Sequence, residues 1–331
     1  MNRTALLSIA ALFLLSACGG GGGGRVESPD PSLEITSNNA MQVATIAYEA
    51  SLESQQLGDA GGGFFFIGSV PSVFSKSDGN LATSAKTGGS VSQVPFPPET
   101  IPCAVSGSTT ISGEIKDPIG GILTAGDFFQ FEYTMCDDGL GEVKNGIVRT
   151  DIDAFNGDLL SELFSMTLTF TLDNFQVSIF ENQSTVPTDV LTSNGSVTIS
   201  IDTTNQSVWS TTISGESLVV DTNASSESLT NFASALTLNG SIFPSPYTTT
   251  ASGTLDSTRL AGVIRYSNPV IFEGFGSDYP SSGEFLVEGL GSTLRLIADN
   301  NVDVRILIDV DADGTVDETI NTTWASLTAL Q

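Results

Sequence analysis

The chain has 331 residues, of which 40% are hydrophobic, and it carries a net charge of −27 because 38 acidic residues outnumber 11 lysines and arginines. A surface this acidic repels nucleic acid and anionic lipid head groups, so we expect no nucleic-acid partner. The sequence contains no histidine, which excludes a Ser-His catalytic triad and the commonest side-chain ligand of transition metals.

The N-terminus reads MNRTALLSIAALFLLSACGGGGGGR and has the pattern of an export signal. Arg3 is followed by an apolar run over residues 5–15 that is too short to span a bilayer, so residues 1–17 are predicted to be a signal peptide. The tetrapeptide LSAC that ends at Cys18 resembles the lipobox of bacterial lipoproteins. This resemblance implies cleavage before Cys18 and lipidation of its thiol. Gly19, at the position where lipoproteins retained at the inner membrane carry Asp, implies an outer-membrane location. The alternative is an ordinary signal peptide with a chance cysteine.

Residues 18–36 are predicted to be a lipidated, flexible tether, because six glycines precede the polar segment RVESPDPS. Each buried CH₂ of an acyl chain contributes about 0.8 kcal/mol, and more than one chain makes anchoring stable. The predicted membrane contact is therefore the N-terminal lipid, with the folded body held away from the bilayer.

Residues 37–57 are predicted to form a helix, since Ser37 or Asn38 can cap its start and Gly58 follows its end. Its apolar stripe, at helical spacing, consists of Met41, Val43, Ala44, Ile46, Tyr48 and Leu52. The expected role of this helix is to cover one face or one end of a sheet.

Residues 58–100 are rich in Gly, Ser and Pro and are predicted to be an irregular connector. The cluster Phe64–Phe66 lies within it. Two interpretations stay open for this cluster, a plug inserted in the core and a tip that touches a membrane.

Two cysteines remain once Cys18 is assigned to the lipid, namely Cys103 and Cys136. An even number in an oxidising compartment favours a disulfide between them. A pair of metal or redox thiols is the alternative, although the spacing matches no zinc pattern.

From residue 101 to residue 331 the hydrophobic pattern has a period of two. In DFFQFEYTM, the side chains of Phe129, Phe131, Tyr133 and Met135 are predicted to share one face. In SMTLTFTLDNFQVSIF the alternation stops at Asp173-Asn174, which suggests a turn, and NGSVTISID starts from the turn dipeptide Asn194-Gly195.

Threonine and serine fill the polar positions of these segments, as expected of antiparallel strands with one wet face. The prediction is an all-β domain, a large antiparallel meander of about sixteen strands that forms a curved sheet, a sandwich or an open barrel.

The segment RILIDVDADGTVDETI, residues 305–320, contains the strongest metal-binding pattern in the chain. Five candidate ligands match the first nine positions of an EF-hand loop: Asp309, Asp311, Asp313, the carbonyl of Thr315, and Asp317. The twelfth position is Ile320 where an EF-hand has Glu, and the flanks read as strands, so the loop is not an EF-hand. It resembles the D-x-D-x-D-G loops that bind calcium in exported proteins.

The loop is predicted to bind Ca²⁺ weakly, with a Kd of about 10⁻⁴–10⁻³ M, because the bidentate ligand is missing. The alternative is a metal-free hairpin closed by Asp313-Gly314. In either case the expected role is structural, as part of a C-terminal Asp-rich hairpin.

The CGGG start and the D-x-D-x-D-G-x-x-D finish before Trp324 also resemble uncharacterised exported lipoproteins of Gram-negative bacteria. This resemblance implies a location and brings no activity with it. Three functions stay open. The first is a non-catalytic envelope lipoprotein with a structural, adhesive or polymer-contacting role. The second is a carrier of a lipid or other apolar ligand, and the third is a glycan-active enzyme that uses two carboxylates.

Overall fold

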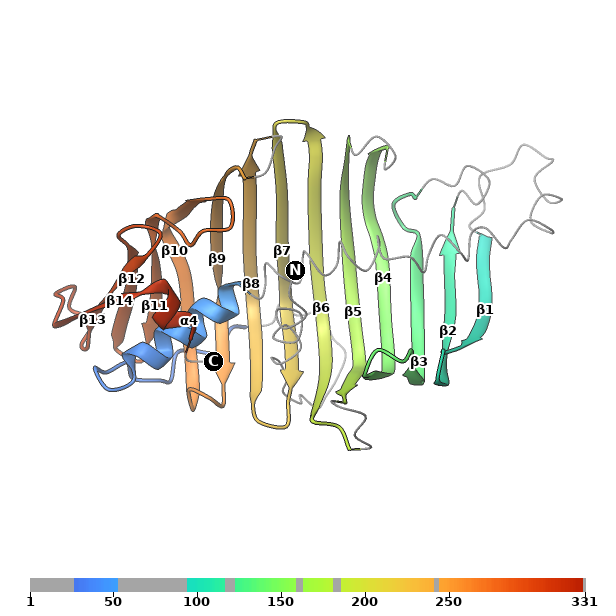
Figure 1. Cartoon of the computed structure of the whole chain (residues 1–331), viewed down its shortest axis with the longest axis horizontal. Coiled ribbons are helices and arrows are strands. Elements are labelled where there is room, and N and C mark those ends of the chain that lie inside the picture. The colour runs from blue at the N-terminus through green and yellow to red at the C-terminus, as the bar shows by residue number, and fades with distance from the viewer. Residues whose placement is uncertain are drawn as a thin grey trace.

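The computed structural model describes residues 27–52, 94–116, 123–158, 163–180, 186–240 and 244–329. The predicted signal peptide, Cys18, the Phe64–Phe66 cluster and most of the predicted connector lie outside these residues. Within them, fourteen antiparallel strands form one curved sheet in which each strand pairs with its neighbours in sequence (Figure 1). The edge strands β1 and β14 do not pair with each other, so the sheet is open. The predicted all-β meander is confirmed as a single curved sheet.

The strands are β1 (Val94–Pro102), β2 (Ser106–Ile115), β3 (Phe128–Asp137), β4 (Glu142–Asp158), β5 (Leu163–Ile179), β6 (Asp189–Asn205), β7 (Val208–Asp221), β8 (Ser226–Asn239), β9 (Pro246–Ser257), β10 (Gly262–Phe275), β11 (Ser282–Gly289), β12 (Ser292–Ala298), β13 (Asp303–Asp309) and β14 (Glu318–Thr323). A helix occupies residues 40–52, and a short helix, α4 (Trp324–Thr328), ends the described chain.

The central strands are longer than the sequence suggested, with 17 residues in each of β4, β5 and β6. The predicted turn at Asp173-Asn174 is wrong, because β5 continues through it and Asn174 forms a bulge with a φ of 47°. The predicted turn at Asn194-Gly195 is wrong for the same reason, since both residues lie inside β6. A bulge and a turn both need a residue that tolerates positive φ, and Asn and Gly supply it in either setting.

These bulges lie side by side on neighbouring strands. Gly146, with a φ of 93°, faces Asn174 so closely that a Cβ atom would collide with the Asn174 carbonyl oxygen. Gly107 faces Met135 in the same way on β2 and β3. Each bulge bends its strand, so a row of them curves the sheet. Met135 has a φ of 47° and is 59% exposed, which corrects its predicted place on the same face as Tyr133.

The strand β1 begins inside the segment that was predicted to be an irregular connector up to residue 100. Its sequence VPFPPETIP contains four prolines and pairs with β2, with a register shift between Phe96 and Glu99. Proline is tolerated there because β1 is an edge strand with one unpaired side. The β domain therefore starts at residue 94, before the predicted residue 101.

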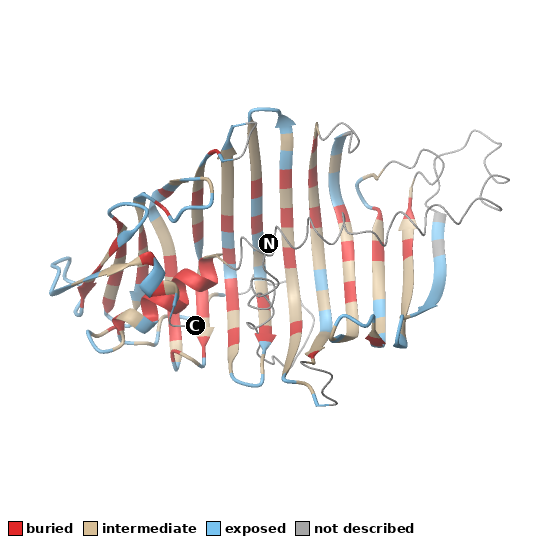
Figure 2. Ribbon diagram, in the orientation of Figure 1, coloured by how far each residue is buried: buried red, intermediate tan, exposed pale blue. Residues whose placement is uncertain are grey.

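One face of the sheet is apolar and the opposite face is rich in hydroxyl groups. Buried residues alternate with more exposed ones along the strands (Figure 2). The buried residues Phe164, Met166 and Leu168 of β5 belong to one core cluster with residues of β12 and β13. On the opposite face, neighbouring strands are joined through hydroxyl groups, as between Thr169 Oγ1 and Thr198 Oγ1 at 2.9 Å.

The helix at residues 40–52 and α4 cover the apolar face over β10–β13 (Figure 1). The Tyr48 ring contacts the rings of Phe285, at 6.3 Å between centroids, and Trp324, at 5.0 Å. Thr45 Oγ1 donates to the Leu327 carbonyl of α4 at 3.0 Å. The predicted helix is thus confirmed over residues 40–52, whereas residues 53–57 lie outside the described part. None of the helices described there is both long and apolar enough to cross a bilayer.

The second half of the predicted tether is bound to the sheet. The backbone N–H groups of Ser32 and Leu33 donate to the Val263 carbonyl at 3.0 and 3.2 Å, and the Leu290 N–H donates to the Leu33 carbonyl at 2.7 Å. The segment therefore passes between the end of β11 and the start of β10. A Cβ on Gly289 would lie 2.5 Å from the Leu33 carbonyl oxygen, so this passage requires glycine there.

Candidate functional site

The Asp-rich segment forms a loop, residues 310–317, between β13 and β14. This connection is longer than a two-residue turn at Asp313-Gly314. The calcium-binding loop and the metal-free hairpin therefore both stay predictions. Strands flank the loop on both sides, as the sequence predicted when an EF-hand was excluded. Asp309, the last residue of β13, is 8% exposed, whereas residues 310–317 are exposed.

Three of the predicted ligands come together in this loop. One carboxylate oxygen from each of Asp309, Asp311 and Asp317 lies within 4.8 Å of the others. Oxygens that share a calcium ion lie about 2.3–2.6 Å from it, so such a spread fits a single ion. Asp313 stands outside this set, and its carboxylate accepts the N–H of Thr315 at 2.7 Å. The carbonyl of Thr315 stays a predicted ligand.

Backbone amides hold the three carboxylates in place. Asp309 accepts the Gly314 N–H at 2.9 Å, and Asp317 accepts the Val310 N–H at 2.9 Å. Asp311 accepts the Asp313 N–H at 3.3 Å. The dipoles of these backbone N–H groups stabilise the negative charge of the carboxylates. A carboxylate oxygen that accepts one N–H retains a lone pair that can bind a cation. The three carboxylates are thus held close to one another, and the binding of Ca²⁺ at this loop stays a prediction.

The predicted disulfide between Cys103 and Cys136 is confirmed, with 5.5 Å between the Cα atoms. Cys103 follows β1 and Cys136 lies on β3, so the bond spans β2. The Thr109 hydroxyl of β2 contacts both sulfurs, at 3.4 Å from Cys103 Sγ and 3.3 Å from Cys136 Sγ. The alternative of a metal-binding or redox dithiol is thereby replaced by a bond that joins the first three strands.

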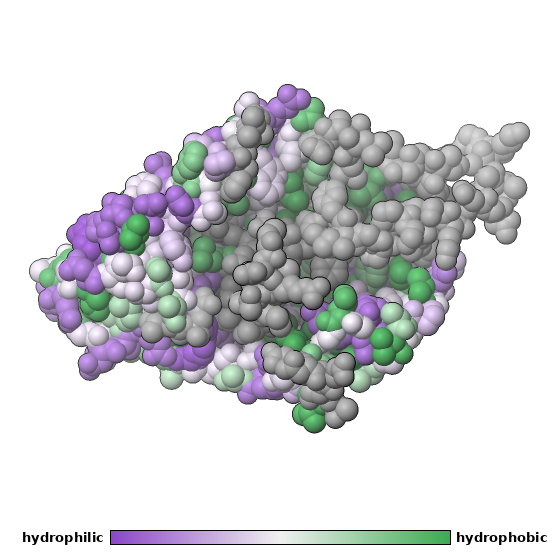
Figure 3. Space-filling model, viewed as in Figure 1, coloured by the Kyte–Doolittle hydropathy of each residue, from purple (hydrophilic) through white to green (hydrophobic). Residues whose placement is uncertain are grey.

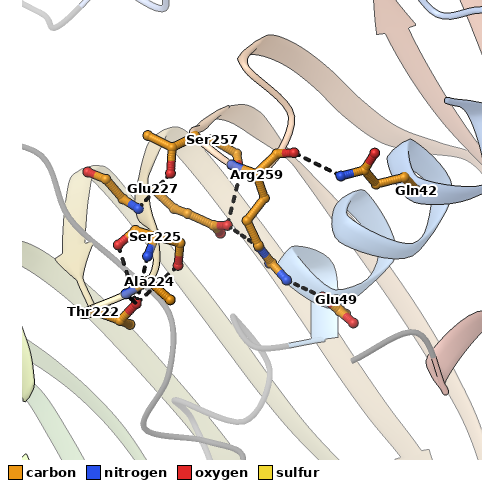
Figure 4. A network of polar contacts seen from close by, with 10 residues as sticks. Gln42, Glu49, Thr222, Ala224, Ser225, Glu227, Ser257 and Arg259 are labelled. Carbon is orange, nitrogen blue, oxygen red and sulfur yellow. Dashed lines mark hydrogen bonds and ion pairs between the residues drawn. The ribbon is translucent and has the colours of Figure 1, made fainter. Parts of the chain in front are cut away.

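An arginine with two buried glutamates attaches the N-terminal helix to the sheet (Figure 4). Arg259, in the turn between β9 and β10, donates from Nε to Glu227 at 2.5 Å and from Nη1 to Glu49 of the helix at 3.2 Å. The Glu227 side chain is fully buried and also accepts the Ser257 hydroxyl at 2.9 Å. Gln42 of the helix donates to the Arg259 carbonyl at 2.9 Å.

Burial lowers the pKa of Arg259, but the hydrogen bonds and charges of Glu227 and Glu49 outweigh it and hold the pKa above the ordinary value. The guanidinium therefore stays charged. Both carboxylates are buried and paired with the same cation, which suits attachment of the helix better than catalysis on a glycan. Burial also raises the pKa of Tyr48, so its phenol stays protonated.

The hydroxyl-rich face carries a shallow hollow of about 200 Å³ over β5–β7. Its lining includes Ser165, Thr167, Ser200, Asp202 and Thr212. Ligand pockets usually measure about 300–1,000 Å³, so this hollow is small for a small-molecule site. Its short hydroxyl side chains fit contact with a polar surface.

Comparisons with protein families, with curated proteins and with solved structures find no match. The assignment of the candidate sites therefore rests on residues and geometry. Sequence reasoning missed the Arg259 cluster, because Glu49, Glu227 and Arg259 are far apart in the chain and no motif joins them. The one sequence signal for such a cluster was the composition. With 38 acidic residues and only 11 lysines and arginines, each cation has many potential carboxylate partners.

Proposed function

We propose that this chain is a non-catalytic lipoprotein of the cell envelope, anchored to the outer membrane through a lipid on Cys18. Its sheet would act as a structural or adhesive module that contacts an envelope polymer. The observation that carries the proposal is the LSAC lipobox ahead of a wide sheet with a hydroxyl-rich face. An open array of Ser and Thr hydroxyls offers donors and acceptors to a polar polymer without enclosing it.

The anchor is tested by mass spectrometry of the denatured protein extracted from membranes. We expect a mass that corresponds to cleavage before Cys18 plus covalent acyl chains, and we expect Cys18→Ser to appear in the soluble periplasmic fraction without them. A mature chain that begins elsewhere, or an unmodified Cys18, would contradict the proposal.

The Asp-rich loop is proposed to bind Ca²⁺ and to join the last two strands. Asp311→Ala is expected to lower the stability measured in calcium and to leave the stability measured in chelator unchanged, because only the bound form loses a ligand. At free calcium roughly ten- to a hundred-fold above Kd, binding stabilises the folded state by about 1–3 kcal/mol. Thermal unfolding in both buffers measures the difference.

The comparison variant for this experiment is Asp313→Ala, because Asp313 stands outside the three-carboxylate set. Its calcium-dependent loss is expected to be smaller than that of Asp311→Ala. Equal losses in calcium and in chelator for Asp311→Ala would remove the calcium site and leave a metal-free loop.

A second candidate function is a carrier of an apolar ligand, favoured by the extent of the apolar face. Its core cluster runs from Ile152 on β4 to Ile308 on β13, whereas the contacts of the described helix lie at the β10–β13 end. A native mass spectrum of the Cys18→Ser chain tests this function. A retained acyl-sized adduct would support the carrier, and a bare chain would exclude it.

A further inference from the structure

The loops of the sheet lie along two opposite edges. One edge, called the lower edge, holds the connections β1–β2, β3–β4, β5–β6, β7–β8, β9–β10, β11–β12 and β13–β14. The connections from β1–β2 to β9–β10 are at the bottom of Figure 1, and the β13–β14 loop is at its left end. The Asp-rich loop and the passage of the N-terminal segment between β10 and β11 are both on this edge.

Exposed aliphatic side chains recur at the loops of the lower edge. Between 37% and 80% of the side chain is exposed at Val105, Leu140, Val186, Leu290, Val310 and Val316. They belong to five different connections, β1–β2, β3–β4, β5–β6, β11–β12 and β13–β14. Figure 3 shows hydrophobic residues near the lower ends of β3–β5.

On the opposite edge, within the described residues, the exposed large hydrophobic side chains are Phe275, Tyr279 and Val302, all between β10 and β13. A single exposed aliphatic residue needs no explanation. Exposed aliphatic residues on five of the seven connections of one edge form a set of apolar tips, each small enough to enter the interface of a bilayer.

The path of the N-terminal segment places the membrane anchor near this edge. Asn231 Nδ2 donates to Ser28 Oγ at 2.7 Å on the outer, hydroxyl-rich face. Asn231 lies five positions into β8 from Ser226, which is about 17 Å from the lower edge at the usual rise per residue. The opposite end of β8, at Asn239, is eight positions away, or about 27 Å.

Cys18 precedes Ser28 by ten residues, and ten residues span at most about 35 Å. A lipid on Cys18 therefore reaches the lower edge with chain to spare. To reach the opposite edge, the connecting chain must be extended to about three-quarters of its maximal span.

The charge of the lower edge limits the kind of lipid surface. Asp138, Asp221, Asp311 and Asp317 are exposed there, so anionic head groups would repel it. Zwitterionic head groups carry no net charge and permit the aliphatic tips to approach.

We infer that the lower edge is a membrane-contacting surface, in which the aliphatic loop tips enter the interface of a zwitterionic bilayer beside the lipid anchor. This inference rests on the proposed function, because the anchor defines which bilayer is within reach. It places the sheet upright on the membrane, with its apolar and hydroxyl-rich faces directed sideways.

The test couples the chain of residues 18–331 through Cys18 to maleimide-bearing lipid in vesicles of brominated phosphatidylcholine. Leu140→Trp and Leu290→Trp report on the lower edge. Val302→Trp is the control on the opposite edge, matched to Leu290 because the two residues are 56% and 60% exposed. We expect the added fluorescence of both lower-edge variants to shift to shorter wavelength and to be quenched by bromine. The control is expected to keep the emission of an indole in water.

Equal quenching at the three positions, or none at any of them, would overturn the inference. Circular dichroism of the three variants confirms that each is folded before coupling. The chemical coupling makes this experiment independent of lipidation in the cell, which the mass spectrum of the natural chain decides separately. The proposal of a lipid anchor and the proposal of a membrane-contacting edge can therefore be disproved independently.

Discussion

Replacing Arg259 with methionine is expected to lower the free energy of unfolding by about 3 kcal/mol, because it leaves buried carboxylates without a cation. Glu227 is fully buried and Glu49 is 7% exposed at the side chain, so neither recovers its hydration in the folded state. The estimate is at the lower end of the range for broken buried pairs, since the Arg259 side chain is itself 29% exposed. Urea unfolding followed by Trp324 fluorescence measures it, because Trp324 contacts Tyr48 of the attached helix.

Arg305→Met is the matched control for this experiment. Arg305 pairs with Asp299 at 2.7 Å, but both side chains are exposed to water, so the loss is expected to be much smaller. Combining Arg259→Met with Glu227→Gln removes one uncompensated charge and should recover part of the lost stability. A double variant no more stable than Arg259→Met alone would show that the guanidinium acts through packing and not through charge.

The sequence predicted the fold class because a period of two survives in strands with one buried face, such as β12. It could not place the strand ends in the middle of the sheet. The dipeptides Asp173-Asn174 and Asn194-Gly195 have the composition of turns, yet they lie inside strands of 17 residues. Local composition reports that a residue tolerates positive φ, whereas the neighbouring strands decide whether that residue makes a turn or a bulge.

The candidate metal loop was predictable because its ligands lie within nine consecutive residues. The same holds for the disulfide, since the chain offers few cysteines. The Arg259 cluster was not predictable, because residues on the helix, β8 and the β9–β10 turn meet only through the fold. The path of residues 28–35 was not predictable for the same reason. Its Ser, Pro and Asp residues have the composition of a tether, and its contacts with Val263 and Gly289 form only in the folded chain.

Removing the disulfide with Cys103→Ser and Cys136→Ser is expected to lower stability by about 3–4 kcal/mol in the chain-entropy model, because the bond closes a loop of 33 residues. The loss should be confined to one end of the sheet. Each strand contacts its neighbours in sequence and no second layer covers β1–β3 among the described contacts, so stability propagates along the sheet as in a linear array. Far-UV circular dichroism in urea should then show an early transition.

Trp324 provides the internal reference for this prediction, because it lies on α4 at the end of the sheet that carries β10–β13. In a Trp209→Phe background, its fluorescence should unfold at the same urea concentration with and without the disulfide. Native protein treated with a reductant should reproduce the early transition. If circular dichroism and Trp324 fluorescence instead move together by the same amount, the fourteen strands unfold as one cooperative unit, and the row of bulges and the helix would then stabilise the whole sheet and not only its covered end.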